Sequence, residues 1–164
     1  MIKLNDHGRL LIIFFAFLIC SCSQNTILDS LDDSTILIEV SFNSGLVGPA
    51  WKAAILRDGQ FVVRNHRDRI LKRSERPIAQ PQLLELKENI LALTGLSAFP
   101  EVEDVEEYRL KVSGHGDIFV GGIKHQFCTP KLVEFQELWR QVVELLGKFP
   151  DCGSACLKVD ECFG

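Results

Sequence analysis

Six cysteines are the residues of this 164-residue sequence that are most able to do chemistry. Cys20 and Cys22 follow an apolar stretch near the N-terminus. The other four lie in the C-terminal part of the chain, at Cys128, Cys152, Cys156 and Cys162. A cysteine sulfur can carry a lipid, bind zinc as the thiolate or join a second cysteine in a disulfide. Which of these applies depends largely on the compartment in which the protein works.

The N-terminal segment has the composition of an export signal. Residues 1–9 are polar and include Lys3 and Arg9, and residues 10–19 (LLIIFFAFLI) form an unbroken apolar run. A run of about ten residues suits the core of a signal peptide, whereas a membrane-spanning helix needs roughly 20. Polar residues from Ser21 onward end the run abruptly. We therefore expect residues 1–21 to be a signal peptide.

The end of this segment, Ile19-Cys20-Ser21-Cys22, resembles the lipobox of bacterial lipoproteins. Cys22 fits as the modified cysteine because small Ser21 precedes it, whereas Cys20 follows bulky Ile19. The resemblance implies that Cys22 receives a diacylglycerol on sulfur, becomes the new N-terminus and is acylated again on nitrogen. Each buried CH₂ contributes roughly 0.8 kcal/mol, so two or three acyl chains anchor a protein firmly. The alternative is an ordinary secretory signal with two incidental cysteines.

The residue after the modified cysteine indicates which membrane holds the anchor. In Gram-negative lipoproteins an aspartate there favours retention in the inner membrane, and this chain has Ser23. The resemblance therefore implies an outer-membrane lipoprotein whose domain faces the periplasm. The polar, acidic residues 22–34 would then be a lipid-anchored tether.

The four remaining cysteines are predicted to form disulfides, because the periplasm oxidises thiols. Three pairings are possible, and the sequence leaves them open. One hypothesis joins Cys128 to a cysteine of the tail 150–164, which would have to fold back along the preceding helix, while Cys152 and Cys156 could close locally. The rival hypothesis is a zinc site of Cys152, Cys156, Cys162 and a histidine. No tight C-x-x-C pair supports zinc, so we predict no metal site.

Nothing else in the sequence has the pattern of a catalytic centre. His66, His115 and His125 are spread over three segments, and the glycines at 114, 116, 121 and 122 do not precede a helix as a phosphate-binding loop would. G-x-S-x-G and H-E-x-x-H are absent. The acidic residues between 101 and 107 lack the alternation of a calcium loop. We predict a protein that is not an enzyme and has no cofactor.

A basic stretch over residues 64–76 is the clearest candidate for binding anionic groups. Its cationic side chains are Arg64, Arg67, Arg69, Lys72, Arg73 and Arg76. Guanidinium groups beside a lipid anchor could meet acidic glycans or lipid head groups. A structural explanation is equally simple, since basic residues protect the edge of a sheet from pairing with another chain or balance the acidic loop.

Composition limits the class of protein. The net charge is −4 at pH 7 and the pI is about 5.6, so the chain lacks the basic character of a nucleic-acid-binding domain. Hydrophobic residues make up 46% and charged residues 24%, as in an ordinary folded domain. We expect one α+β domain at residues 35–149 and a cysteine-containing tail at 150–164.

Apolar periodicity predicts the elements of that domain. Apolar residues alternate from Ile36 to Phe42 as in a half-buried strand. Asp58-Gly59 predicts a hairpin between residues 51–57 and 60–66, and residues 70–71 could add a short edge strand. A second hairpin is expected over residues 108–123.

Two helices are predicted, each beginning at a proline. Pro81 precedes the stripe Leu83, Leu86, Ile90 and Leu93, and Pro130 precedes a wider apolar face that ends near Gly147. Two such stripes need a sheet to cover. The sequence therefore predicts an antiparallel sheet of about five strands with both helices packed on one face.

The layout of residues 36–146 resembles the emfourin-type domain, a bacterial family that includes a protein inhibitor of thermolysin-like metalloproteases. The shared features are a strand leading into Ser44-Gly45, the Asp58-Gly59 hairpin, a leucine-rich helix before Phe99-Pro100, the Tyr108 strand and a helix after Pro130. The basic stretch and the cysteine tail depart from this layout. The resemblance implies the fold and assigns no inhibitory residue.

These observations lead to two hypotheses for function. The first is a non-enzymatic cell-envelope lipoprotein that binds another protein, as a protease inhibitor or accessory subunit. The alternative is a surface-binding module that uses residues 64–76 on anionic glycans or lipid heads. High salt separates the two, because contacts with a polyanion weaken with ionic strength much more than a packed protein interface does.

Replacing Cys22 by alanine tests the anchor. We expect Cys22→Ala to leave an unprocessed precursor without lipid, because the acylated sulfur is lost. Electrophoretic mobility and mass spectrometry of the membrane fraction would show this, with Cys20→Ala as the control that is still processed. Normal processing of Cys22→Ala would rule out the anchor at this residue.

Overall fold

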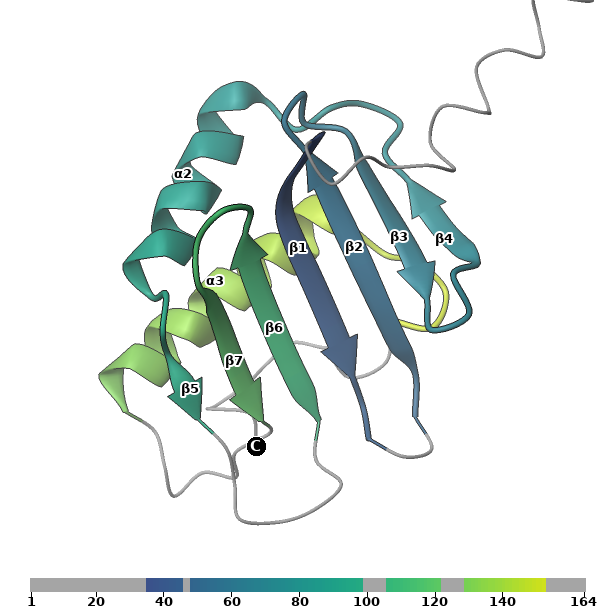
Figure 1. Ribbon diagram of the computed structural model, residues 1–164. Helices are drawn as coiled ribbons and strands as arrows, with labels where there is room; N and C mark the ends of the chain where they lie inside the picture. The colour runs from purple at the N-terminus through teal and green to yellow at the C-terminus, as the bar shows by residue number, and fades with distance from the viewer. Residues whose placement is uncertain (1–34, 46–47, 99–105, 122–128, 153–164) are drawn as a thin grey trace, which may run out of the picture. The chain divides into compact units, whose positions relative to one another are not determined.

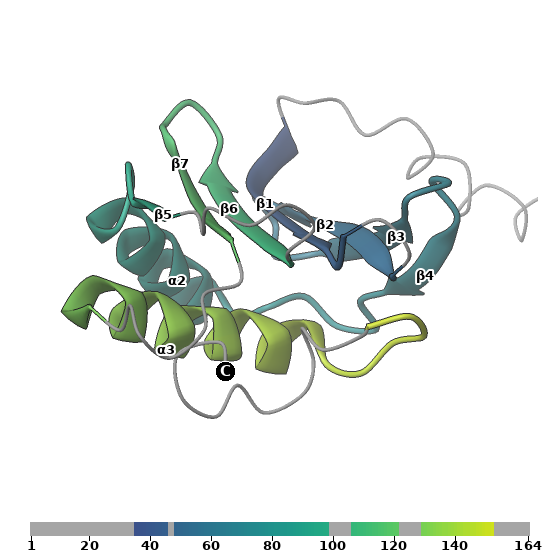
Figure 2. The same cartoon turned by 90° about the horizontal axis from the view of Figure 1, so that it is seen from below.

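The computed structural model describes residues 35–45, 48–98, 106–121 and 129–152, which form one sheet with two helices on one of its faces. Figure 1 shows the sheet from its open side, and Figure 2 shows both helices beneath it. Because the helices and most of the strands are separate in sequence and the sheet is mainly antiparallel, the fold is α+β.

Seven strands form the sheet, in the order β4-β3-β2-β1-β6-β7-β5. The strands are β1 (Ile36–Asn43), β2 (Ala50–Leu56), β3 (Phe61–Asn65), β4 (Ile70–Arg73), β5 (Ser97–Ala98), β6 (Glu107–Val112) and β7 (Asp117–Gly121). The first four and β6–β7 pair antiparallel, and the two-residue β5 pairs parallel with β7.

The strand register places most apolar residues of the strands on the face that the helices cover, whereas buried Val62 of β3 pairs with Ala54 on the other face. Phe42 lies opposite Trp51 of β2 and opposite Tyr108 of β6. Val40 and Leu110 form the next pair on the same face, and both are buried. Alternate side chains of a strand point to opposite faces, so this register directs the polar residues outward.

Charged side chains form ion pairs between strands on the open face of the sheet. Lys111 of β6 pairs with Glu39 of β1 at 3.0 Å, and Arg109 of β6 pairs with Asp117 of β7 at 2.9 Å. These pairs join neighbouring strands and are about half exposed. An antiparallel sheet with one solvated face has this pattern of charges.

The Asp58-Gly59 turn joins β2 and β3 as the sequence predicts. Gly59 has φ of 86°, a conformation that favours glycine. Its carbonyl accepts a hydrogen bond from Ile78 N at 2.9 Å, and a Cβ on Gly59 would lie 2.4 Å from Ile78 O. The turn is therefore packed against the segment that leads into the first helix.

Helix α3 (Pro130–Leu146) begins at its predicted proline, and helix α2 (Gln80–Ala92) begins one residue before Pro81. In α2 the buried residues are Leu83, Leu86 and Ile90, which belong to the predicted stripe. The Thr129 hydroxyl accepts from Leu132 N at 3.4 Å and caps the start of α3. Gly147, with φ of 65°, follows the end of α3.

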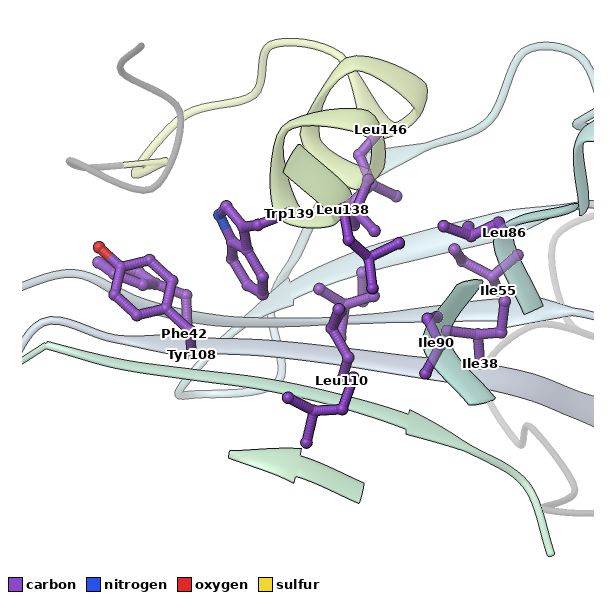
Figure 3. Packing of buried hydrophobic residues seen from close by; sticks show 14 of the residues in the cluster. Ile38, Phe42, Ile55, Leu86, Ile90, Tyr108, Leu110, Leu138, Trp139 and Leu146 are labelled. Carbon is purple, nitrogen blue, oxygen red and sulfur yellow. The ribbon is translucent and has the colours of Figure 1, made fainter. Parts of the chain in front are cut away.

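Trp139 of α3 fixes this helix to the centre of the sheet, as Figure 3 shows. Its ring lies 6.0 Å from that of Trp51 on β2 and 5.0 Å, edge to face, from that of Tyr108 on β6. Phe135, one turn earlier, lies 6.1 Å from Trp139. Aromatic pairs at these distances stabilise the core in addition to the burial of apolar area. Trp139 is also the largest fully buried side chain of the core.

The predicted fold class is confirmed, and the strand count differs. The sequence predicts about five strands, and the structure has six antiparallel strands. The additional one is formed by residues 70–73, which pair with β3 at the edge of the sheet. Its basic sequence hides the alternation by which strands are recognised. The two-residue β5 was not predicted, since it is too short to show any periodicity.

We expect Trp139→Ala to lower the free energy of unfolding by about 3–5 kcal/mol, because it leaves a cavity against two strands. Urea unfolding followed by circular dichroism measures this. Val133→Ala on the same helix is the control, since Val133 is 51% exposed and should change stability by less than about 0.5 kcal/mol. Equal effects of the two substitutions would contradict the packing of α3 described above.

Candidate functional site

The basic stretch forms the β3–β4 hairpin and lies at one edge of the sheet (Figure 1). We call its six cationic residues the basic edge: Arg64, Arg67, Arg69, Lys72, Arg73 and Arg76. Among the described strands, β4 pairs only with β3. The anion-binding role of these residues stays a prediction.

The turn between β3 and β4 is built by the side chain of Asn65. Its Oδ1 accepts hydrogen bonds from the backbone N–H of Arg67 and of Arg69, both at 3.0 Å. Asp68 adopts φ of 57°, a conformation that aspartate tolerates better than most residues. The turn therefore holds the backbone at Arg67 and Arg69 in one conformation.

Asp68 ties this turn to the neighbouring strand β2. Its carboxylate pairs with Lys52 at 2.7 Å, and its carbonyl accepts from Arg64 at 3.2 Å. The Lys52 ammonium, mainly through this hydrogen bond, lowers the pKa of Asp68 below its ordinary value. Both side chains are more than half exposed, so the pair orients the turn more than it stabilises the fold.

Lys72 has a structural role that the sequence did not reveal. Its ammonium donates to the backbone carbonyl of Lys148 at 3.3 Å and lies 6.0 Å from the ring centre of Phe61. Lys72 therefore connects β4 to the segment after α3 and is not an exposed binding group.

Three arginines of the basic edge remain available to a ligand. Arg67, Arg69 and Arg76 are exposed, and none forms an ion pair with another described residue. Arg67 contacts His66, whose Nε2 lies 3.2 Å from Arg67 Nε. Arg67 and Arg69 lie at one end of β4, and Arg76 lies beyond the other end.

The form of β4 favours contacts through side chains. The strand has four residues, carries a register shift opposite Val63 and Arg64, and is flanked by arginines. Short length, a bulge and basic side chains each disfavour the addition of another strand to a sheet edge. A ligand at this edge would therefore meet guanidinium groups rather than backbone hydrogen-bonding groups.

Cys152 is the one predicted disulfide cysteine among the described residues. It is buried, at 9% exposure, and its disulfide stays a prediction. Its carbonyl accepts from Trp51 Nε1 at 3.4 Å, and the Phe149 ring meets that of Trp51 edge to face at 5.0 Å. The segment after α3 is thus packed against the core at Trp51.

Several predicted residues lie outside the described part of the chain. They are Cys22, Cys128, Cys156 and Cys162, so the lipid anchor, the cysteine pairing and the zinc alternative stay predictions. His125 and most of the acidic loop also lie there. His66 and His115 belong to turns at opposite ends of the sheet. Within the described ranges, no three His, Cys, Asp or Glu residues are grouped so as to hold a metal ion.

Comparisons with known proteins give no relative for this chain. No protein-family model, curated protein or solved structure matches it. The resemblances to bacterial lipoproteins and to the emfourin-type domain therefore remain predictions from sequence. No helix among the described residues has the length and apolarity needed to cross a membrane.

We expect loss of the Cys152 disulfide to lower the free energy of unfolding by about 2–4 kcal/mol. Thermal unfolding followed by tryptophan fluorescence suits this test because Trp51 contacts the segment that ends at Cys152. A reductant should lower the Tm of the wild type by more than it lowers that of Cys152→Ser. Alkylation of all four predicted disulfide cysteines in the untreated protein would contradict the disulfides.

Proposed function

We propose that this chain is a non-enzymatic lipoprotein of the cell envelope, anchored through Cys22, that binds anionic groups through its basic edge. The observation that carries the proposal is the exposure of Arg67, Arg69 and Arg76 without ion pairs among the described residues. The ligand chemistry is a phosphate or carboxylate that a guanidinium group can grip with two parallel hydrogen bonds.

The rigidity of the β3–β4 turn supports this proposal. Asn65 fixes the backbone at Arg67 and Arg69, so less conformational entropy is lost when these residues bind. A tether of residues 22–34, fully extended, would reach at most about 45 Å from the membrane. A domain confined so close to a surface meets anionic groups there at a high effective concentration.

A protein partner is the second candidate function, as an inhibitor or an accessory subunit. A surface apart from the basic edge supports this candidate. That surface is a groove between α2 and α3. A protein bound there would leave the basic edge unoccupied, so the two candidate functions can be tested separately.

We expect a triple substitution Arg67→Gln, Arg69→Gln and Arg76→Gln to weaken binding to anionic vesicles by roughly 100-fold, since each basic residue near such a surface contributes about 1 kcal/mol. The measurement is co-sedimentation of a soluble form that begins at Ser23 with vesicles containing phosphatidylglycerol. Neutral phosphatidylcholine vesicles and a soluble acidic glycan form separate arms, which distinguish lipid from glycan.

The matched control replaces three cations of the helices, with Lys87→Gln, Lys131→Gln and Arg140→Gln. This variant changes the net charge equally and leaves the basic edge intact. The proposal requires that the control binds like the wild type and that high salt abolishes binding. Equal weakening by both triple variants would show that net charge alone governs binding.

A further inference from the structure

The groove between α2 and α3 is the feature of the described surface that the basic edge does not explain. Two hollows, of about 280 Å³ and 370 Å³, line up along it, and Gln141 borders both. Figure 2 shows the two helices side by side beneath the sheet. The groove is open to solvent along its length, which suits an extended or helical segment better than an enclosed small molecule.

The floor of the groove is apolar. Leu86 and Leu145 contribute to one hollow, and Leu93 and Leu138 contribute to the other. Val133 lies at the second hollow and is 51% exposed. Val133 and Leu84 are the two large apolar side chains that are exposed in the described part of the chain, and both belong to the helices.

Every charged residue that lines the groove is acidic. Glu85 and Glu144 border one hollow, and Glu134 and Glu137 border the other. Glu137 is already paired with Arg140. The other three glutamates form no ion pair with a described residue. The groove thus combines an apolar floor with a rim of one sign of charge.

We propose that the groove binds a cationic amphipathic helix of a partner protein. An apolar stripe at i, i+3, i+4 and i+7 would lie on exposed Val133 and half-buried Leu145, and lysine or arginine side chains beside it would meet Glu85, Glu134 and Glu144. The complementary charge selects this partner over an acidic or neutral helix, since like charges across an interface are repelled. This inference deepens the protein-binding candidate of the proposed function by naming the chemistry of the partner.

The test uses the full-length protein in a mild non-ionic detergent and a dye-labelled helical peptide of leucine and lysine with that spacing. Fluorescence anisotropy should show saturable binding, with a scrambled peptide of the same composition binding roughly tenfold more weakly. Val133→Ser and Glu134→Lys should each weaken binding by roughly tenfold. Binding of the dye-labelled peptide to detergent alone gives the background.

Two matched controls separate the groove from general surface effects. Leu84→Ser replaces an apolar side chain that is about as exposed as Val133. Glu88→Lys reverses an exposed charge on α2. Neither Leu84 nor Glu88 lines the groove. Both controls should bind the peptide like the wild type. Absence of saturable binding, or equal losses in test and control variants, would overturn the proposal. Vesicle binding by the basic edge is measured with other variants, so that proposal can hold even if the groove does not bind the peptide.

Discussion

The contact between Trp139 and the two central strands determines where the rest of the helical layer can lie. Its ring meets Trp51 of β2 and Tyr108 of β6, which are joined across the sheet by Phe42 of β1. Because side chains of an antiparallel register fix one another's positions, a helix held at these rings can cross the sheet in few ways. With α3 held there, α2 packs beside it over the β6 side, and the groove between them is a consequence of this arrangement.

Contacts with Trp51 and Lys72 also hold the segment after α3 near the edge strand β4. Phe149 packs on Trp51, the Cys152 carbonyl accepts from the Trp51 indole, and the Lys148 carbonyl accepts from Lys72 of β4. The predicted disulfide at Cys152 would add a covalent restraint to this segment. The edge strand β4 is therefore held by the segment after α3 as well as by its pairing with β3. This support explains how a strand of four residues with few apolar side chains holds a fixed position.

Sequence periodicity predicted most of the fold and little of the candidate site. The stripe Leu83, Leu86 and Ile90 and the alternation around Val40 were readable because burial repeats with the period of the element. The role of Lys72 was not readable, since its ammonium contacts the carbonyl of Lys148, which is far away in the sequence. An asparagine that precedes a cluster of polar residues was the only available signal for the turn. The acidic groove arises from two helices far apart in sequence, and no local pattern contains it.

The distribution of charge matters more for this domain than its net charge. The net charge of −4 describes the whole chain, whereas salt at physiological strength screens charges beyond about 8 Å. A domain of this size is wider than that distance, since a chain of about 100 residues has a radius of gyration near 13 Å. A ligand at Arg69 therefore experiences the basic edge and little of Glu134 in the groove. Two surfaces of opposite sign can then select different partners on one domain, and occupying one need not weaken the other.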